Sequence, residues 1–196
     1  MKINYGSSKG LGEIVLSFDD GPHPINTPKL LNLLKKENIK ALFFIVGQNI
    51  ESGKNFDIVK RAFDEGHVIG NHTYSHKNLK KLSDVEIKSE ILRAEELVGN
   101  YLTIPKLIRP PYGAADMRVN KIIHELGYFS VLWNIDTLDW KNRSINWVND
   151  AINQVKLRED SIILMHDIHK TTVDNVSNLI AKIRDQEKQF NFIAYV

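Results

Sequence analysis

Residues 14–34 read IVLSFDDGPHPINTPKLLNLL, an apolar run followed by a turn and then by leucines at helical spacing. The run Ile14–Phe18 predicts a buried strand, because it is short, nearly all apolar and closed by turn residues. We expect Thr27 to cap a helix that has Pro28 at its first position, where the missing N–H of proline costs nothing. The stretch therefore predicts a strand–turn–helix unit, with an apolar helix face made of Leu30, Leu31, Leu33 and Leu34.

The same alternation continues along the chain. Further strands are predicted at Ala41–Val46, His67–Ile69, Lys106–Ile108, Tyr128–Trp133, Ser161–Met165 and Phe190–Val196. Two further helices are predicted at Phe56–Glu65 and Val119–Leu126. A third begins at the Ser83/Glu86 capping box and has Ile87, Ile91, Ala94 and Val98 on one face. A fourth begins at Ser144 with Ile145, Val148, Ile152 and Val155 facing inward, and the last contains Val176, Leu179, Ile180 and Ile183.

Alternating strands and helices imply a parallel sheet with helices outside, hence an α/β fold. Seven such repeats predict a distorted (β/α)7 barrel related to the eight-unit TIM barrel. We expect a single domain over residues 1–196, of which residues 1–12 are a short N-terminal extension. In barrels of this kind the active site lies at the C-terminal ends of the strands.

Composition narrows the functional classes. The 196 residues are 42% hydrophobic and 26% charged, which is ordinary for a globular domain. The formal net charge of +2 is too small to indicate a nucleic-acid partner. The absence of cysteine excludes disulfides and thiolate metal sites. No apolar run reaches the length of a membrane span, and Met1–Gly12 has no signal-peptide core, so we expect a cytosolic protein or a catalytic domain cut from a longer secreted chain.

Five short motifs follow predicted strands at their carboxyl ends. They are SFDDGP (17–22), HTYSH (72–76), RPPYG (109–113), DTLDW (136–140) and LMHD (164–167), after the first, third, fourth, fifth and sixth strands. Because these strand ends share one mouth of a parallel barrel, we expect the five motifs to converge although they are far apart in sequence.

The first two motifs supply metal ligands. Two imidazoles, His72 and His76, and a carboxylate from Asp19 or Asp20 would form a triad with open positions for water and substrate. Neighbouring strand residues point to opposite faces, so both aspartates can share the site only if Gly21-Pro22 bends the chain. Taken alone, the histidine pair is more typical of a protein surface than of a metal site, and the Asp-Asp-Gly-Pro stretch is typical of a plain acidic turn. Zinc suits these ligands, and cobalt, nickel or iron(II) would also fit.

Together the motifs resemble the polysaccharide deacetylase family, also called the NodB-homology domain or carbohydrate esterase family 4. The resemblance runs from about Ile14 to Val196 and is strongest to the deacetylases of N-acetylglucosamine in peptidoglycan or chitin. The chain has Ser17 where the family usually has threonine. The resemblance implies that Asp20, His72 and His76 hold one divalent metal ion, with zinc the first candidate.

The resemblance also implies roles for the remaining site residues. Asp19 is expected to act as the base and Arg109 to pair with it, while His166 acts as the acid and Asp139 hydrogen-bonds that histidine. The backbone N–H of Tyr112 is expected to stabilise the oxyanion. The acetyl pocket is expected to be formed by Tyr112, Trp140 and Leu164.

The activity that the resemblance implies is metal-dependent hydrolysis of the N-acetyl group of N-acetylglucosamine units in peptidoglycan or chitin-like polysaccharide, with release of acetate. The implied partner is the polysaccharide, and the expected state is an extracellular or cell-envelope monomer with no membrane span in this chain. Three alternatives stay open at this point: an O-acetyl esterase of the xylan type, an iron(II) oxygenase, and an inactive glycan-binding domain.

Overall fold

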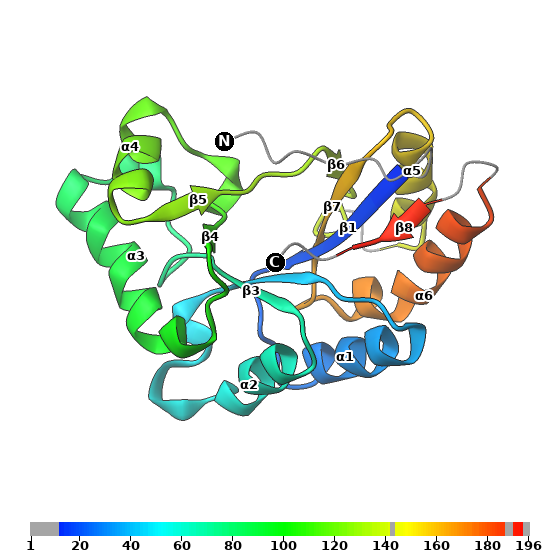
Figure 1. Cartoon of the computed structure of the whole chain (residues 1–196), viewed down its shortest axis with the longest axis horizontal. Coiled ribbons are helices and arrows are strands. Elements are labelled where there is room, and N and C mark those ends of the chain that lie inside the picture. Colours follow the sequence, from blue (N-terminus) through cyan, green and yellow to red (C-terminus); the bar gives the residue numbers. More distant parts are fainter. Residues whose placement is uncertain (1–11, 142–143, 187–189, 194–196) are drawn as a thin grey trace.

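The computed structural model describes residues 12–141, 144–186 and 190–193, and its centre is a curled parallel sheet (Figure 1). The strands are β1 (Gly12–Asp19), β2 (Leu42–Ile45), β3 (Val68–Asn71), β4 (Lys106–Ile108), β5 (Tyr128–Ser130), β6 (Ile135–Asp136), β7 (Ser161–His166) and β8 (Phe190–Phe192). Seven of them follow one another in the order β5-β4-β3-β2-β1-β7-β6, and β8 pairs with β1. The path thus runs from β5 to β6 as a distorted, incompletely closed barrel, which confirms the predicted fold.

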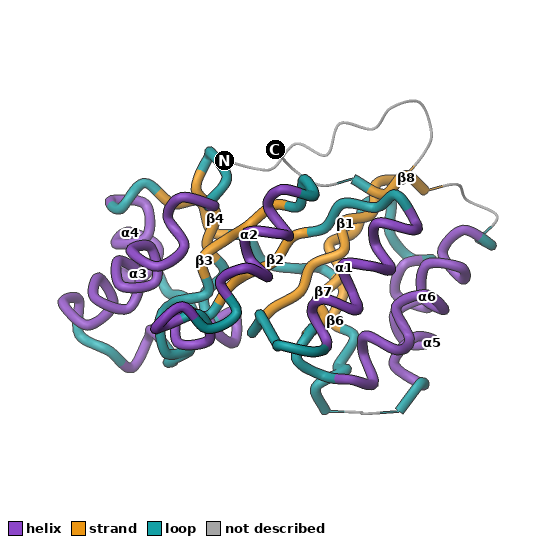
Figure 2. The backbone as a smooth tube through the Cα atoms, turned by 90° about the horizontal axis from the view of Figure 1, so that it is seen from below, coloured by secondary structure: helices purple, strands orange, loops and turns teal. Residues whose placement is uncertain are grey.

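Helices cover the outside of this sheet (Figure 2). They are α1 (Asn26–Glu37), α2 (Phe56–Asp64), α3 (Asp84–Val98), α4 (Met117–Glu125), α5 (Asn146–Val155) and α6 (Lys170–Arg184). None of the helices in the described ranges is both long and apolar enough to cross a membrane.

Strand β1 shows how the two faces of the sheet divide. Ile14, Leu16 and Phe18 belong to the large cluster that joins sheet and helices, whereas Val15 belongs to a smaller cluster on the other face. Because strand side chains alternate, Ser17 and Asp19 lie on the same face as Val15. The face enclosed by the curled sheet therefore begins apolar and ends polar, at the carboxyl end of the strand.

The α3 helix forms as predicted from the sequence. The Ser83 hydroxyl accepts from the Glu86 N–H and the Glu86 carboxylate accepts from the Ser83 N–H, which is the predicted capping box. The predicted face of Ile87, Ile91, Ala94 and Val98 is fully buried. This buried stripe also contains one charged residue, Glu90.

Two predicted helix starts are wrong. Helix α1 begins at Asn26, so Pro28 is its third residue and Thr27 is not its cap. The Thr27 hydroxyl instead donates to Asp167 and accepts from the His23 N–H, a tertiary contact that competes with capping. Helix α5 begins at Asn146, and Ile145 is 53% exposed rather than inward. Trp147, fully buried, packs against the sheet in its place.

The predicted strand Tyr128–Trp133 is also too long. Strand β5 ends at Ser130, and an additional strand, β6, forms at Ile135–Asp136 beside β7. The chain leaves the sheet here because the carbonyls of Val131 and Leu132 accept hydrogen bonds from the Arg109 side chain. The DTLDW motif consequently follows β6 rather than the fifth strand. Strand β8 confirms the last predicted strand over its first three residues, while positions 194–196 lie outside the described ranges.

Candidate active site

The five motifs converge on one cleft of about 390 Å³ at the carboxyl ends of the strands. Its lining consists of Asp19, Asp20, His72, His76, Tyr112, Trp133, Asp136, Trp140, Leu164 and His166. Every predicted site residue is in this set except Arg109 and Asp139. Both of these are fully buried beneath the cleft surface. Arg109 contacts the lining residue Asp19, and Asp139 contacts the lining residue His166.

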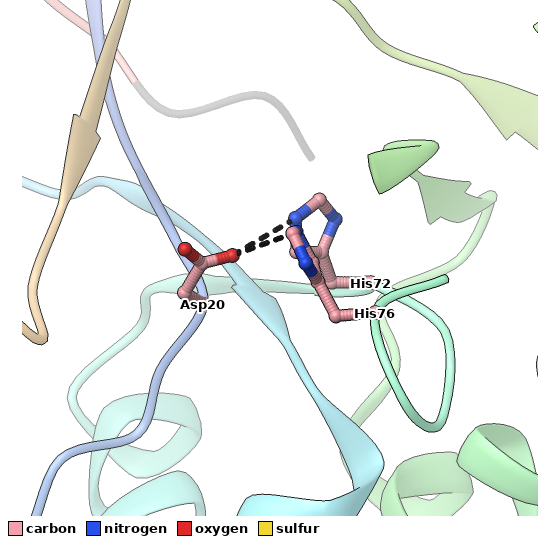
Figure 3. Close-up of side chains that lie close together, drawn as sticks. All are labelled: Asp20, His72 and His76. Atoms are coloured by element: carbon pink, nitrogen blue, oxygen red, sulfur yellow. Dashed lines mark ion pairs between the residues drawn. The ribbon is translucent and has the colours of Figure 1, made fainter. Parts of the chain in front are cut away.

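The metal-ligand set predicted by resemblance is brought together in this cleft (Figure 3). Asp20 Oδ1 lies 3.3 Å from His72 Nε2 and 3.1 Å from His76 Nε2. The possible ligand atoms of the three residues all lie within 4.8 Å of one another. Asp20 follows β1, and both histidines follow β3 in the loop 72–76.

Hydrogen bonding fixes how His72 faces this cluster. Its Nδ1 lies 2.6 Å from the backbone oxygen of Arg109, which can only accept, so Nδ1 carries the proton. The Nε2 lone pair is thereby directed toward Asp20, whose Oδ1 is buried without a hydrogen-bond partner among the described residues. Two electron-rich atoms facing each other need a cation between them. The residues therefore fit a divalent metal ion bound by two nitrogens and one oxygen.

The charge state of Asp20 suits the same purpose. Burial raises the pKa of its carboxyl group, but the neighbouring imidazoles of His72 and His76 outweigh burial and hold that pKa below its ordinary value. The carboxylate is therefore ionised over the whole neutral range and available as a ligand.

The backbone explains how two adjacent aspartates enter one cleft. Asp20 itself has φ +69°, so the chain turns one residue earlier than the predicted bend at Gly21-Pro22. The turn is held by the Asn49 amide, which donates to the Asp20 carbonyl at 2.6 Å, and by the Val46 N–H, which donates to the Gly21 carbonyl at 3.0 Å. Gly21 is required for space, because a Cβ there would lie 2.6 Å from both carboxylate oxygens of Asp167.

Asp19 differs from Asp20 in its partners. It is 3% exposed, and its Oδ1 accepts from Arg109 Nη1 at 2.7 Å. Arg109 also donates to the Ser17 hydroxyl and to the Val131 and Leu132 carbonyls, and its guanidinium lies 4.2 Å from the centre of the Phe44 ring. A cation fixed at so many points keeps Asp19 in one orientation, with its second oxygen 3.7 Å from His72 Nε2.

His166, at the end of β7, is held in the same manner by Asp139. Its Nδ1 lies 2.8 Å from Asp139 Oδ1, which leaves Nε2 for the cleft. Burial lowers the pKa of His166, but the Asp139 carboxylate outweighs burial and, with Asp19 and Asp20, raises the pKa to about 9. The imidazole is therefore protonated at neutral pH and able to donate a proton.

The remaining wall of the cleft is apolar and aromatic. Tyr112 has φ +61°, is 67% exposed, and packs the edge of its ring against His76 at 4.7 Å between centroids. Trp140 and the buried Leu164 lie where predicted, and Trp133 adds a wall that the sequence reasoning missed. The sequence places Trp133 at the end of the predicted strand Tyr128–Trp133, although a tryptophan just before DTLDW is a signal that the motif's surroundings are aromatic. A Cβ at Gly113 would lie 3.0 Å from Trp133, so this indole is closely packed against the RPPYG motif.

Comparison with known proteins gives a match to one family. The family profile described as "Polysaccharide deacetylase" matches residues 7–131. A Bacillus cereus protein named peptidoglycan-N-acetylglucosamine deacetylase is 47% identical over 133 residues, which are 67% of this chain and 48% of that protein. The Listeria monocytogenes protein of the same name, PgdA, is 37% identical over 178 residues, which are 90% of this chain and 37% of that protein. The chain thus spans half or less of the length of these relatives.

A solved structure shows the same fold. The crystal structure of a peptidoglycan N-acetylglucosamine deacetylase superposes with a TM-score of 0.83 at 38% identity. The alignment covers 92% of this chain and 86% of that one. The fold described above is therefore shared along nearly the whole chain.

Proposed function

The chain belongs to the polysaccharide deacetylase family, and on this basis we propose that it hydrolyses the N-acetyl group of N-acetylglucosamine units in a peptidoglycan or chitin-like polysaccharide. The observation that carries the proposal is the complete set of groups in one cleft: a possible metal triad, a separately held carboxylate, and a protonated histidine. A glycan-binding domain without activity would not need the base and the acid together.

The family is metal-dependent, and we propose zinc as the ion, held by Asp20, His72 and His76. These three residues would hold the ion, and the chemistry it would supply there is polarisation of the acetyl carbonyl and a lowered pKa of water. The two histidines are neutral donors and Asp20 supplies one negative charge, so a bound ion retains net positive charge toward the substrate.

Asp19 is the proposed base. Its Oδ1 is occupied by Arg109, so Oδ2 is the oxygen free to accept a proton from the attacking water. Arg109 keeps the carboxylate from rotating and from replacing Asp20 as a ligand. The backbone N–H of Tyr112 is the proposed donor to the oxyanion, and one such donor lowers a barrier by roughly 3 kcal/mol.

His166 is the proposed acid. Its Nε2 faces the cleft, and protonating the leaving amine there allows the carbon–nitrogen bond to break. Asp139 stabilises the imidazolium before that transfer. Tyr112, Trp140 and Leu164 form the proposed acetyl pocket, with Trp133 beside them.

The wider setting of this activity is also a proposal. The main core joins the sheet to its helices along the described chain, which supports a single catalytic domain. The relatives are named for peptidoglycan, so we propose that this domain acts on an extracellular or cell-envelope glycan. We also propose that it is a monomer.

The test is acetate release from N-acetylglucosamine oligomers, before and after treatment with a chelator and with zinc or cobalt restored. We expect chelator-sensitive release that the added metal rescues. Asp19→Asn should abolish release while zinc stays bound, whereas Asp20→Asn should lose zinc as well. Release that is unaffected by the chelator, or that survives Asp19→Asn, would contradict the proposal. Release from acetylated xylan alone would favour an ester substrate.

A further inference from the structure

The two histidines of the metal triad are held in different ways. His72 continues from β3, its side chain is 2% exposed, its N–H donates to the Ile45 carbonyl, and its Nδ1 donates to the Arg109 carbonyl. His76 lies in the loop beyond, with a side chain 27% exposed and φ +56°. The position of His76 therefore depends on what holds the loop 72–76.

This loop has a strained backbone. Thr73 has φ +65°, and left-handed geometry is unusual for a β-branched residue. Left-handed geometry in a residue other than glycine is unfavourable and persists only where surrounding contacts determine it. Thr73 and His76 both have this geometry, so the loop requires strong contacts from outside it.

Helix α3 supplies those contacts. Glu90 lies on its buried stripe and is 8% exposed, and its carboxylate accepts both from the Ser75 N–H at 2.8 Å and from the Ser75 hydroxyl at 2.6 Å. The Glu90 carbonyl accepts from the Tyr74 N–H at 2.9 Å. One helical residue thus fixes two successive loop residues, the second of which directly precedes His76.

One turn farther along α3, Arg93 holds the outside of the same loop. Its guanidinium lies 3.5 Å from the centre of the Tyr74 ring, and it donates to Glu51, which also accepts from the Tyr74 hydroxyl at 2.7 Å. Arg93 is an exposed partner, whereas Glu90 is nearly buried, and hydrogen bonds to a buried carboxylate are stronger. The backbone N–H groups of Gly47 and Gln48 also hold the loop, by donating to the Thr73 and Tyr74 carbonyls. Glu90 is therefore the main side-chain support of the loop.

We propose that Glu90 is a positioning residue that sets the metal affinity of the site by fixing Ser75 and, through it, His76. The proposal rests on the proposed metal-dependent function. Lys77 Nζ lies 3.6 Å from Glu90 Oε1, but the Lys77 side chain is 61% exposed, so this ion pair contributes little. The proposal therefore needs the geometry of Glu90 more than its charge, because the amide oxygen of a glutamine side chain could accept from the Ser75 N–H while its NH2 group donates to the Ser75 hydroxyl. A glutamine at this position should therefore restore what an alanine loses.

The experiment measures the zinc dissociation constant of the whole chain by competition with a chromogenic chelator, without substrate. Loss of a group that orients a metal ligand weakens metal binding by about 10–100-fold, and we expect this for Glu90→Ala. Glu90→Gln should stay within a few-fold of the wild type. Glu96→Ala, an exposed position on the same helix, is the matched control and should change nothing.

Two results would overturn the proposal. One is Glu90→Ala binding zinc as tightly as the wild type, even if the metal-free melting temperature falls, since that describes a residue that only stabilises the fold. The other is Glu90→Gln binding as weakly as Glu90→Ala. Should Glu90→Ala fail to fold, the zinc affinity of Ser75→Ala is measured instead. This variant removes only the hydroxyl that donates to Glu90, and an unchanged zinc affinity would contradict the proposal that the Glu90–Ser75 contact positions His76. Because zinc affinity is measured without turnover, these results stand whether or not acetate is released.

Discussion

Replacing Asp139 by Asn removes the charge that keeps a proton on His166. The Asp139 carboxylate is fully buried and accepts from three donors: the His166 ring at 2.8 Å, the His166 N–H at 2.8 Å and the Thr172 hydroxyl at 2.7 Å. The Thr137 hydroxyl lies 3.1 Å from the carboxylate, but its one proton has a nearer acceptor in the Leu164 carbonyl at 2.8 Å. Asparagine has nearly the same shape and can retain part of this network, so the substitution changes charge more than packing.

The size of the effect follows from the pKa of His166. That pKa is raised from 6.5 to about 9, although burial acts in the opposite direction. The difference corresponds to about 3 kcal/mol in favour of the protonated imidazole. Without the Asp139 charge, burial dominates, and the pKa should fall to the ordinary histidine value or lower. Near pH 7.5 the imidazole would change from almost wholly protonated to mostly neutral.

The assay is the pH dependence of kcat/KM for acetate release, which reports the essential groups of the free enzyme. A raised histidine pKa supports activity below it, and activity declines as the pH rises through it. The alkaline limb should therefore lie near 9 in the wild type and at or below the ordinary histidine value of 6.5 in Asp139→Asn. At its best pH the variant should retain part of its activity, since a neutral asparagine still orients the ring.

The control is Asp136→Asn, which makes the same chemical change at another carboxylate of the DTLDW motif. Asp136 lines the cleft and accepts from the Leu138 N–H at 2.9 Å, so its loss alters the cleft without touching His166. Its alkaline limb should not move. An alkaline limb in Asp139→Asn at the wild-type position would refute the assignment of His166 as the acid supported by Asp139.

Three further predictions concern the scaffold of the site. Arg109→Lys should lower the free energy of unfolding by about 3–5 kcal/mol, as measured by urea denaturation. Lysine cannot donate to all four acceptors of Arg109 and leaves Asp19 partly unpaired. A change below about 1 kcal/mol would contradict this prediction. Gly21→Ala should destabilise the fold by about 1–3 kcal/mol and weaken zinc binding, because the new Cβ meets Asp167 next to Asp20; Gly99→Ala, where a Cβ has only an ordinary contact, should do neither. Burial is the main cause that lowers the pKa of His67 from 6.5 to about 4. Between pH 6.5 and 4, His67 therefore binds a proton in the unfolded chain but not in the folded chain. Stability should fall by up to about 3 kcal/mol over that interval, and the non-titrating His67→Asn variant should lose less if the reasoning holds.

Much of this architecture could be predicted because its determinants are local. Short apolar runs such as Ile14–Phe18 mark strands on their own, and the Ser83/Glu86 pair marks the start of α3. The motifs follow strand ends, and parallel strands bring those ends to one mouth. Convergence of Asp19, His72 and His166 therefore follows from the order of the elements without knowledge of any distance.

The errors arise where tertiary contacts override local patterns. Thr27 is of a residue type that often caps helices, but its hydroxyl donates a hydrogen bond to Asp167, which is far away in the sequence. Val131 and Leu132 continue an apolar run, but Arg109 captures their carbonyls and the strand ends. In both cases a side chain distant in sequence offers a better partner to a polar group than the local element does.

The residues that line the cleft are supported by residues behind them, and only some of these supports are marked in the sequence by motifs. His166 is supported by Asp139 and Asp19 by Arg109, and both supports lie within motifs because their own elements end at the cleft. Glu90 supports the loop of His76 from the middle of a helix, so no motif contains it. Its mark is a different one: a glutamate on an otherwise apolar stripe, between Ile87 and Ile91. A buried carboxylate must find donors, and in a barrel the donors nearest to a covering helix are the loops that leave the strands. Charged residues on the buried stripes of such helices are therefore the positions at which further supports of a cleft should be sought.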